Sequence, residues 1–579
     1  MINTLKRVMN YAKPYRLHFF LTITFALVSV GFSLSIPVFI GEAVDCALGH
    51  NSVDFKKLFH IILILISAII ISTLFQWLMC LSTNKLAFNT VRDLRCDTFE
   101  KIEKVPLKYI DGNQKGQLTS RVINDIEIIS DGLLQGFAQL FSGIVTIIGT
   151  IIFMLTINVK ITIVVIALTP LSFIVASRIT KLSRDTFLKQ SKLRGEMISL
   201  TEELVGNQKT VKSFVYEERA EKRFEVINSQ FGKTGVLATF YSSMTNPTTR
   251  FVNGLIYAAI GCIGALGAIG SLKIIGVMSV GRLSSFLAYS NQYTKPFNEI
   301  SGVIAELQNA VASAERVSTL LDEEEVSDDS KCENLTECNG TLTFDNVSFS
   351  YTPQTKLIEN FSLNVKKGQK VAIVGPTGCG KSTIINLLLR FYDINSGNII
   401  ISGKNTFDIS RDSLRSSFGM VLQETWIFTG TIAENIAYGK PDASQNEIEN
   451  AAKAVFAHSF IKRLPKGYET IVSEDSGLSQ GQKQLICIAR IMLMNPPMLI
   501  LDEATSSIDL RTEQKIQLSF QNLMKGKTSF IIAHRLSTIK NADIILVMKN
   551  GNIIEQGKHE ELIEQNGFYA NLYASQFNS

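Results

Sequence analysis

The first candidate for chemistry is a glycine-rich stretch that ends in Lys-Ser-Thr and fits the pattern G-x-x-x-x-G-K-S. An apolar run, Val371 to Val374, precedes it and another, Ile384 to Leu389, follows it, which predicts a strand, a loop and a helix in that order. In such a loop the glycines let successive backbone N–H groups point at phosphate oxygens, and the helix N-terminus adds partial positive charge. We therefore predict a nucleoside triphosphate site formed by Gly375, Pro376, Thr377, Gly378, Cys379, Gly380, Lys381, Ser382 and Thr383.

Side chains for a metal and for hydrolysis follow from the same pattern. Lys381 is expected to reach the β- and γ-phosphates, and the Ser382 hydroxyl is expected to bind Mg²⁺. The apolar run from Met498 to Leu501 ends in Asp502 and Glu503, so a buried strand is expected to deliver two carboxylates to the site. Asp502 is expected to hold Mg²⁺ through water, and Glu503 is expected to polarise the attacking water.

A third motif, Leu478-Ser479-Gln480-Gly481-Gln482, leads into a predicted helix from Lys483 to Met494. It resembles the signature sequence L-S-G-G-Q of ATP-binding cassette (ABC) proteins, with Gln480 in place of the first glycine. Together with the phosphate loop and the carboxylates, it makes the chain resemble an ABC half-transporter of the exporter kind. The resemblance covers nearly the whole chain. It implies ATP hydrolysis coupled to transport, with ATP and Mg²⁺ as cofactors.

The resemblance also assigns residues around the nucleotide. It implies that Tyr351 stacks on adenine, that Gln423 links the nucleotide and Mg²⁺ to the membrane domain, and that His534 contacts the γ-phosphate. Asp509 is implied to cross the interface between two nucleotide domains. Taken singly, each of these residues is as typical of a core, cap or surface position. Cys379 has two interpretations, a small residue that fills the loop or a reactive thiol whose alkylation blocks ATP binding.

The composition indicates a membrane protein. Of the 579 residues, 46% are hydrophobic and only 19% are charged. Roughly 20 apolar residues span a hydrocarbon core of about 30 Å, and such runs predict six membrane-spanning helices, at about 17–40, 58–81, 133–157, 161–176, 252–269 and 274–289. The net charge of +5 is mild, so nothing favours nucleic acid as a partner. The eight cysteines form no C-x-x-C pair, which is typical of free thiols rather than a zinc site.

The links between the predicted spans alternate between short and long. The long links, 82–132 and 177–250, carry most of the basic residues, so the positive-inside rule places them and both termini in the cytoplasm of a cell-membrane protein. Both keep apolar residues at helical spacing, which predicts helices that continue out of the membrane and turn back. At the turns, near 106–112 and 209–217, we expect either amphipathic segments that dock on a partner domain or plain helical hairpin turns.

These patterns predict two successive domains. Residues 1–321 are expected to form an all-α transmembrane domain of six helices with long intracellular extensions, starting with a short interfacial helix that ends at Pro14. An acidic linker, 322–339, follows it. Residues 340–579 are expected to form an α/β ATP-binding domain around the phosphate loop.

In the family that the chain resembles, ATP is bound head to tail between two nucleotide domains. One domain contributes the phosphate loop and the other the signature residues, here Ser479, Gln480, Gly481 and Gln482. This chain therefore needs a second ABC half-transporter. Gln480 adds bulk where a glycine lets the backbone approach the phosphate, and the resemblance to two-chain exporters favours a heterodimer over a homodimer. In such a pair this chain is expected to be the catalytic subunit that supplies Glu503.

Two other functions stay open on the sequence. One is an ABC-type channel or regulator that uses ATP only as a gate, against which the intact Glu503 argues. The other is an importer of the energy-coupling or siderophore kind. Six spans exclude a soluble ABC protein that acts on ribosomes or DNA. Because the spans hold few charges and only scattered polar groups such as Gln76, Asn253 and Gln292, the expected substrate is lipophilic: a drug, a lipid or a peptide.

Overall fold

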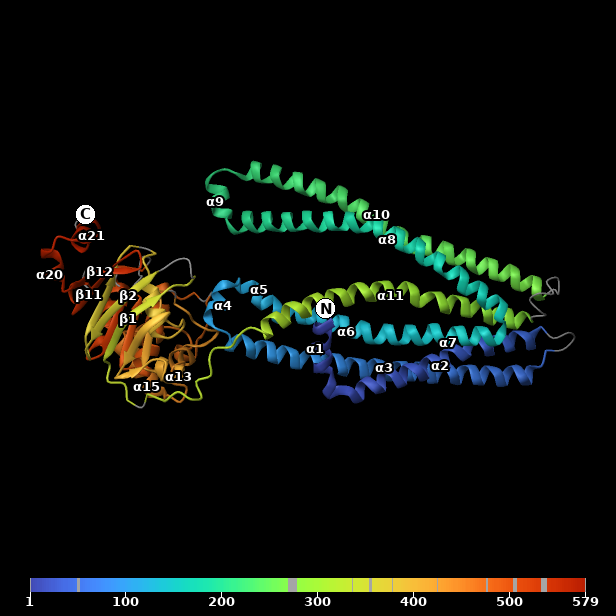
Figure 1. The fold of residues 1–579 in the computed structure, drawn as a ribbon, viewed down its shortest axis with the longest axis horizontal. Helices are drawn as coiled ribbons and strands as arrows, with labels where there is room; N and C mark the ends of the chain where they lie inside the picture. The colour runs from blue at the N-terminus through green and yellow to red at the C-terminus, as the bar shows by residue number, and fades with distance from the viewer. Residues whose placement is uncertain are drawn as a thin grey trace. The chain divides into compact units, whose positions relative to one another are not determined.

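The computed structural model describes residues 2–48, 53–268, 279–335, 337–352, 357–376, 378–423, 425–474, 477–502, 508–532 and 539–577. Its chain divides into two units, labelled by element in Figure 1. The first unit comprises Met1–Glu103 and Gln114–Glu323, and the second comprises Lys104–Asn113 and Glu324–Ser579.

The first unit is helical through nearly all of its described residues. Its elements are α1 (Ile2–Ala12), the 3-10 helix η1 (Lys13–Tyr15), α2 (Arg16–Ala47), α3 (Phe55–Lys104), α5 (Lys115–Ser120), the π-helix η2 (Arg121–Asp125), α6 (Ile126–Gln135), the π-helix η3 (Gly136–Leu140), α7 (Phe141–Ile157), α8 (Val159–Gly206), α9 (Gln208–Ser213), α10 (Glu217–Ala268) and α11 (Val280–Leu321).

Four of the described helices are far longer than a membrane requires. α3, α8, α10 and α11 have 50, 48, 52 and 42 residues, which at 1.5 Å per residue is about 63–78 Å, against a hydrocarbon core of about 30 Å. The prediction that helices continue out of the membrane is thus confirmed. By length and composition, α3, most of α10 and the stretch Lys6–Ala47 are able to cross a membrane, while α7 and Val159–Pro170 are shorter apolar helices. The predicted spans 252–269 and 274–289 extend outside the described residues.

Both predicted turns contain a short helix. α4 (Leu107–Gly112) follows α3 and belongs to the second unit, and α9 joins α8 to α10. Immediately after α9, the side chains of Phe214 and Val215 are 77% and 83% exposed. An apolar tip of this kind is typical of a surface that a partner covers.

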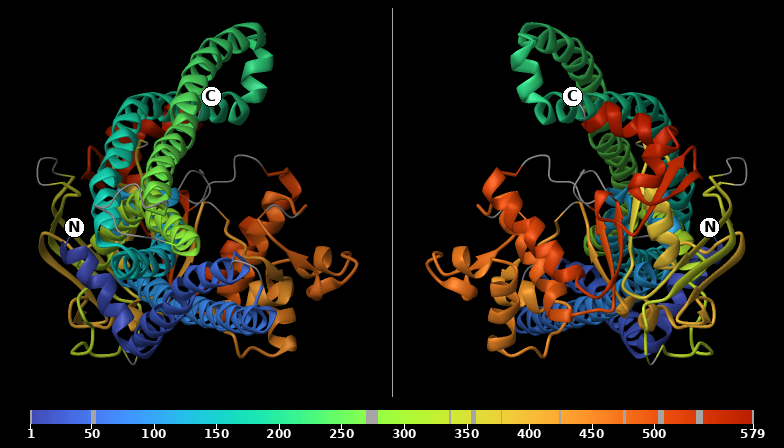
Figure 2. Two further views of the ribbon diagram at one scale, coloured as in Figure 1. Left: turned by 90° about the vertical axis from the view of Figure 1, so that its right-hand side faces the viewer. Right: turned by 90° about the vertical axis from the view of Figure 1, so that its left-hand side faces the viewer.

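Helix α11 holds the first unit together. It packs against α2, α6 and α7, while α8 packs chiefly against α10. Figure 2 shows the hairpin of α8 and α10 standing apart from the other helices of this unit at its α9 end. Pro37 removes one N–H group from the hydrogen-bond ladder of α2. Two hydroxyls of α11 donate to carbonyls beside it, Tyr289 to Leu34 O, and Ser285 to Pro37 O at 2.6 Å.

The predicted N-terminal helix is present and is fixed to the rest of the unit. Val8 is buried in a cluster that includes Val91 of α3 and Val317 of α11. Arg7 forms an ion pair with Asp322 directly after α11. The N-terminus therefore belongs to the helical unit through both apolar and charged contacts.

The second unit combines sheets and helices in the manner predicted for the nucleotide-binding domain. Its strands are β1 (Leu342–Phe349), β2 (Ile358–Val365), β3 (Lys370–Val374), β4 (Ser396–Ile401), β5 (Lys404–Asn405), β6 (Phe418–Val421), β7 (Gly430–Thr431), β8 (Ile471–Val472), β9 (Met498–Asp502), β10 (Thr528–Ile532), β11 (Ile544–Lys549) and β12 (Asn552–Gly557). Its helices, besides α4, are α12 (Lys381–Leu388), α13 (Arg411–Ser416), α14 (Ile432–Ala437), α15 (Gln445–Ala454), α16 (His458–Ile461), the 3-10 helix η4 (Gly467–Glu469), α17 (Gln480–Met494), α18 (Leu510–Met524), α20 (His559–Glu564) and α21 (Phe568–Phe577).

A six-stranded sheet with the order β12-β11-β3-β10-β9-β6 divides the apolar core of this unit into two. Alternate residues of each strand face opposite sides. Val371 and Ile373 of β3 join the core that contains α12, whereas Ala372 and Val374 join the core that contains α17. A second sheet, β2-β1-β4-β5, is antiparallel and packs in the core of α12. Helices α12 and α17 therefore cover opposite faces of the central sheet.

The acidic segment before β1 is attached to the second unit rather than extended in solvent. Asp329 pairs with the buried guanidinium of Arg411 and accepts a 2.6 Å hydrogen bond from its backbone N–H. Glu333 donates its N–H to Asp408 O and accepts from Ser410 N at 2.8 and 3.0 Å. Residues 324–335 therefore run along the region between β5 and α13 as part of this unit.

Candidate nucleotide site

The candidate site lies at the edge where the parallel strands of the six-stranded sheet end. Ile532 of β10 pairs with Ile373 of β3 on one side and with Asp502 of β9 on the other, and Val421 of β6 pairs with Leu501. Strands in this register end together, and open α/β sheets bind ligands at that edge. The sheet therefore gathers the phosphate loop, Asp502 and the loop that contains Gln423.

The predicted strand and helix on either side of the phosphate loop are confirmed as β3 and α12, and the loop between them is described at 375–376 and 378–380. Gly378 and Gly380 have φ values of 82° and 100°, a left-handed backbone that only glycine adopts readily. Gly375 is constrained by space instead. A Cβ there would lie 2.3 Å from Met548 O and 2.8 Å from Cys379 Sγ. The loop conformation thus follows from the position of its glycines.

Two side chains of the loop have defined environments. Lys381 Nζ donates to Gly375 O at 2.8 Å and to Pro376 O at 3.0 Å, so the ammonium group lies over the loop that is to receive phosphates. Cys379 is 3% exposed and belongs to the apolar core beside α12. This burial supports the interpretation of Cys379 as a filler of the loop and argues against a reactive thiol, because a reactive thiol must be accessible.

Tyr351 lies beside the phosphate-loop helix and keeps part of its surface exposed. Its hydroxyl is 3.2 Å from Thr383 Oγ1, and it accepts from Asn386 Nδ2 at 3.3 Å, both on α12. The residue is 37% exposed, which leaves surface on which a base can stack. The structure thus brings Tyr351 to the helix that follows the phosphate loop, as the predicted adenine contact requires.

Not every predicted site residue lies in the described part of the chain. Thr377, Glu503 and His534 lie outside the described residues. Glu503 follows β9 directly, and His534 comes two residues after the end of β10. Ser382 and Gln423 are exposed at the sheet edge.

The signature residues form the start of α17. Ser479 is the N-cap, and its hydroxyl accepts from Gln482 N at 3.3 Å while Gln482 Oε1 accepts from Ser479 N at 2.9 Å. This reciprocal capping box fixes the N-terminus of the helix. Gly481 is required by packing, since a Cβ there would lie 2.5 Å from Thr512 Cγ2 on α18. A fixed helix N-terminus is suited to face an anion.

Gln480, which replaces a glycine of the signature, has a hydrogen-bond partner within its own chain. Its Nε2 donates to Thr425 Oγ1 at 3.0 Å. Thr425 lies two residues after Gln423. The side chain thereby connects the start of the signature helix to the loop that carries the predicted Mg²⁺-linked glutamine.

Asp509, the predicted interface residue, caps α18. Its carboxylate accepts from Thr512 N at 2.9 Å. Hydrogen bonds from the Thr512 backbone and side chain hold the pKa of Asp509 below its ordinary value, since they favour the charged form. A charged, exposed carboxylate is therefore presented at the N-terminus of this helix.

Known proteins share these features. Two family models match, the ABC transporter transmembrane region at residues 19–297 and the ABC transporter model at residues 358–506. Over 520 residues the chain is 41% identical to a fatty acid ABC transporter ATP-binding/permease protein of Mycobacterium tuberculosis, covering 90% of this chain and 82% of the relative. It is 35% identical over 587 residues to a putative multidrug export ATP-binding/permease protein of Bacillus subtilis, covering 99% of this chain and 100% of the relative. The solved structure of a bacterial Atm1-family ABC exporter with ATP bound is 30% identical and has a TM-score of 0.78, with 97% of this chain and 98% of that chain covered.

This chain belongs to the ABC exporter family. The predicted family, the fold class and the ATP hydrolase activity coupled to transport are thereby confirmed. The exporter is a multi-pass membrane protein.

The donor set of the exporter fits Mg²⁺. Mg²⁺ prefers oxygen ligands and keeps several waters. The Ser382 hydroxyl, the Asp502 carboxylate and the Gln423 amide oxygen are of this kind, and the sheet edge gathers the segments that carry them. When bound, the ion would neutralise charge on the β- and γ-phosphates.

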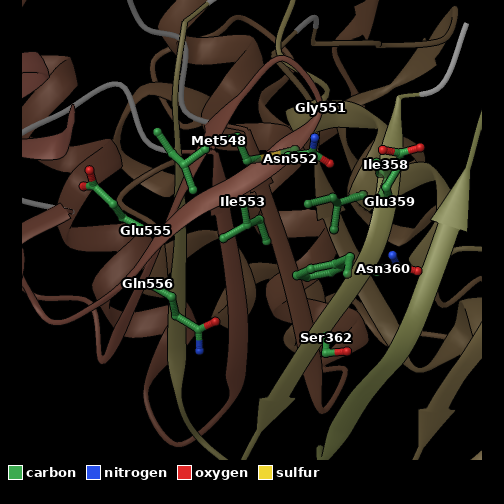
Figure 3. A pocket seen from close by; sticks show the side chains of 13 residues that line it. Ile358, Glu359, Asn360, Ser362, Met548, Gly551, Asn552, Ile553, Glu555 and Gln556 are labelled. Carbon is green, nitrogen blue, oxygen red and sulfur yellow. The ribbon is translucent and has the colours of Figure 1, made fainter. Parts of the chain in front are cut away.

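A polar groove behind the phosphate-loop helix is separate from this site. It has a volume of about 540 Å³ and lies between β2 and β12, with Ile384 of α12 in its wall. Figure 3 shows the side chains of Glu359 and Ser362 on β2 and Asn552 and Gln556 on β12 around it. None of the described ATP-site residues is among those that line the groove.

Three residues that the sequence did not single out adjoin the predicted site. They are Asn386 and Thr425, described above, and Tyr392, whose ring lies 4.9 Å from that of Tyr351. Asn386 is one helical turn from the predicted Thr383, so its spacing was a usable signal. No signal in the sequence pointed to Thr425 or Tyr392, because their contacts depend on how distant segments fold together.

Proposed function

We propose that this exporter moves a lipophilic substrate out of the cell with the free energy of ATP binding and hydrolysis, at sites shared between two nucleotide domains. The observation that carries the proposal is the placement of α12 and α17. Ile384 and Leu388 of α12 pack in one core, and Leu485 and Ile486 of α17 pack in the core on the other face of the sheet. The capped N-terminus of α17 is therefore available to the phosphate loop of a second chain rather than to its own.

Sharing the nucleotide gives ATP binding a mechanical consequence. The phosphates of ATP on the loop of one domain attract the N-terminus of the signature helix of the other domain. ATP binding therefore favours the closed pair of domains over the separated domains. Glu503 then polarises the attacking water, and loss of the γ-phosphate weakens the contact. Closure of the domains drives the long helices that carry α4 and α9 and thereby changes the side of the membrane to which the substrate cavity opens.

The exposed tip after α9 supports a second chain. Phe214 and Val215 present apolar surface at the far end of the α8–α10 hairpin. Trp426 and Tyr438 form an exposed aromatic surface with Arg490 stacked on Tyr438, its guanidinium 4.9 Å from the ring centroid. We assign the apolar tip of one chain to this aromatic surface of the other, because each is a surface that burial stabilises.

The lipophilic substrate is supported by the helical unit. An open apolar groove of about 450 Å³ lies between α2 and α3, with Leu27, Phe32, Phe39 and Ile64 in its wall. A groove of this size and polarity suits a hydrocarbon chain or a small aromatic compound. The names of the relatives, one a fatty acid transporter and one a putative multidrug exporter, point to the same chemistry.

Six spans with both termini in the cytoplasm complete the proposal, because the basic residues gather on the long links.

Transport direction in inside-out vesicles tests the function. With the nucleotide domains facing the medium, addition of ATP and Mg²⁺ is expected to concentrate the substrate in the lumen. A fluorescent long-chain fatty acid and a lipophilic cationic dye are suitable probes, and at least one should accumulate. Vesicles that contain the Glu503→Gln variant are the control, and neither probe should accumulate in them. ATP-dependent release from preloaded vesicles would indicate an importer. Equilibration without accumulation would indicate an ATP-gated channel.

For the second half we propose a different chain, because Gln480 adds bulk at the position where a signature glycine lets the partner's phosphate approach. A homodimer is the second candidate, and a specific observation favours it. Gln480 is hydrogen-bonded to Thr425 of its own chain, which gives the glutamine a role that does not require an altered partner. In either pair, the proposed ATP site needs residues from two chains.

Expression of this chain alone decides between the two pairs. In a heterodimer the isolated chain is expected to lose ATPase activity by about tenfold or more relative to the co-purified pair, because no signature completes its site. Gln480→Gly restores the glycine and is expected to raise the activity of the isolated chain. Thr425→Val is the matched control, since it removes the hydrogen bond but keeps the glutamine. A stable dimer of this chain with full ATPase activity would contradict the heterodimer.

A further inference from the structure

Within the second unit, Tyr392 connects the region of the phosphate-loop helix to α4. Its hydroxyl donates a hydrogen bond to the Asp111 carboxylate on α4. Burial raises the pKa of Tyr392 well above its ordinary value, and the hydrogen bond to Asp111 adds to that rise. The phenol therefore stays protonated and stays a donor. α4 follows α3 in the chain, and this bond holds α4 within the second unit.

The ring of Tyr392 is in contact with the predicted adenine platform. The ring centroids of Tyr351 and Tyr392 are 4.9 Å apart, and the planes meet at 88°. Phe349 packs edge-on against both, at 4.9 Å from Tyr351 and 5.9 Å from Tyr392. Edge-to-face contacts depend on orientation. If the Tyr351 ring turns, the Tyr392 ring must therefore turn as well for the edge-to-face contact to be kept.

Tyr351 itself is held from the side of the phosphates. Its hydroxyl is within hydrogen-bonding distance of Thr383 and Asn386 on α12. The chain of contacts is thus continuous from the phosphate-loop helix through Tyr351 and Tyr392 to Asp111. Every link in it is directional, being either a hydrogen bond or a perpendicular ring contact.

We propose that Tyr392 is a positioning residue that transmits occupancy of the adenine site to α4. The inference rests on the proposed function, because it assigns the base of ATP to Tyr351. A base stacked on Tyr351 restricts the orientation of that ring. The restriction keeps Tyr392 at the orientation in which its hydroxyl reaches Asp111. By linkage, a state of the membrane helices that favours the bond from Tyr392 to Asp111 also strengthens ATP binding.

Hydrogen exchange of α4 measures this link directly. The otherwise unmodified exporter and the Tyr392→Phe variant are both prepared with Glu503→Gln to prevent hydrolysis. Exchange of the amides in 107–112 is followed with and without ATP and Mg²⁺. ATP is expected to slow exchange in the otherwise unmodified exporter by about fivefold or more, the lower limit of typical coupling between sites. Tyr392→Phe keeps the ring and removes the hydroxyl. It should abolish most of this protection and, because linkage is reciprocal, weaken ATP binding by up to about fivefold, so ATP is kept saturating in both samples. Retained protection of α4 in Tyr392→Phe would overturn the proposal.

A second variant and a control separate this role from general stability. Asp111→Ala removes the acceptor and should have the effect of Tyr392→Phe, and the double variant should be no worse than either, because residues of one link are not additive. Tyr468→Phe is the matched control. It removes a hydroxyl that is 2.8 Å from His458 Nδ1 in the same unit, and it should leave α4 protected. Additive effects of the two link variants, or an equal effect of Tyr468→Phe, would also overturn the proposal.

The outcome is independent of whether export itself is found. In vesicles at saturating ATP, Tyr392→Phe without the Glu503 change should lower the substrate transported per ATP by about fivefold or more. If the unmodified exporter hydrolyses ATP but moves no lipophilic probe, the proposed function fails while the exchange experiment still stands. If export is normal and Tyr392→Phe exports as well as the unmodified protein, only the role of Tyr392 fails.

Discussion

Replacement of Glu503 by glutamine is expected to reduce ATP turnover by about 10²- to 10⁴-fold, the usual contribution of a general base. Glu503 follows Asp502 at the end of β9, which the sheet aligns with the strand that precedes the phosphate loop. Glutamine keeps the size of the side chain but cannot take a proton from the attacking water. ATP binding should persist, because the phosphate loop and Asp502 are unchanged.

Two measurements on the same preparation check this expectation. Steady-state phosphate release gives the turnover, and retention of labelled ATP gives the binding. Glu560→Gln, an exposed carboxylate on α20, is the control and should leave both unchanged. If Glu503→Gln hydrolysed ATP at the normal rate, the general-base role would have to be assigned to another residue.

Replacement of Lys381 by alanine is expected to act one step earlier and to weaken ATP binding itself. A hydrogen bond to a charged group contributes about 1.5–3 kcal/mol, which corresponds to roughly 10- to 150-fold in Kd. In the structure, Lys381 Nζ also holds the carbonyls of Gly375 and Pro376 at 2.8 and 3.0 Å. Its loss therefore removes a charge from the phosphates and loosens the loop.

Equilibrium binding of a fluorescent ATP analogue gives the Kd. Lys367→Ala removes an exposed lysine just before β3 and controls for the loss of one positive charge. Lys381→Arg tests geometry, since a planar guanidinium cannot occupy the compact position of an ammonium group. Normal binding by Lys381→Ala would remove the assigned contact with the β- and γ-phosphates.

The sequence alone determined those parts of the exporter whose geometry is local. The phosphate loop is an example, because its shape depends on which residues tolerate a left-handed backbone, and Gly378 and Gly380 stand where that is needed. The capping box of Ser479 and Gln482 is another, since its two partners are three residues apart. The long helices and their short reversals also followed from helical spacing within single segments.

Only the tertiary structure decided which distant segments meet. Tyr392 and Asp111 are 281 residues apart, and Gln480 and Thr425 are 55 residues apart. The motif left open whether Cys379 is a buried filler of the loop or an accessible, reactive thiol. Only the packing of Cys379 against Gly375 and the core around α12 decided between the two. The opposite placement of α12 and α17 depends on the order of strands in the sheet.

The physical reason is the range of the interactions. Backbone angles, caps and helical periodicity are set by residues within about four positions, so a motif records them directly. Strand order and the pairing of distant side chains are selected by burial of apolar surface across the whole domain, and no short motif records that choice. The residue types of this chain thus specified its phosphate loop and its signature motif. The packing of the sheet placed the signature helix on the face opposite the phosphate-loop helix and joined Tyr392 to α4.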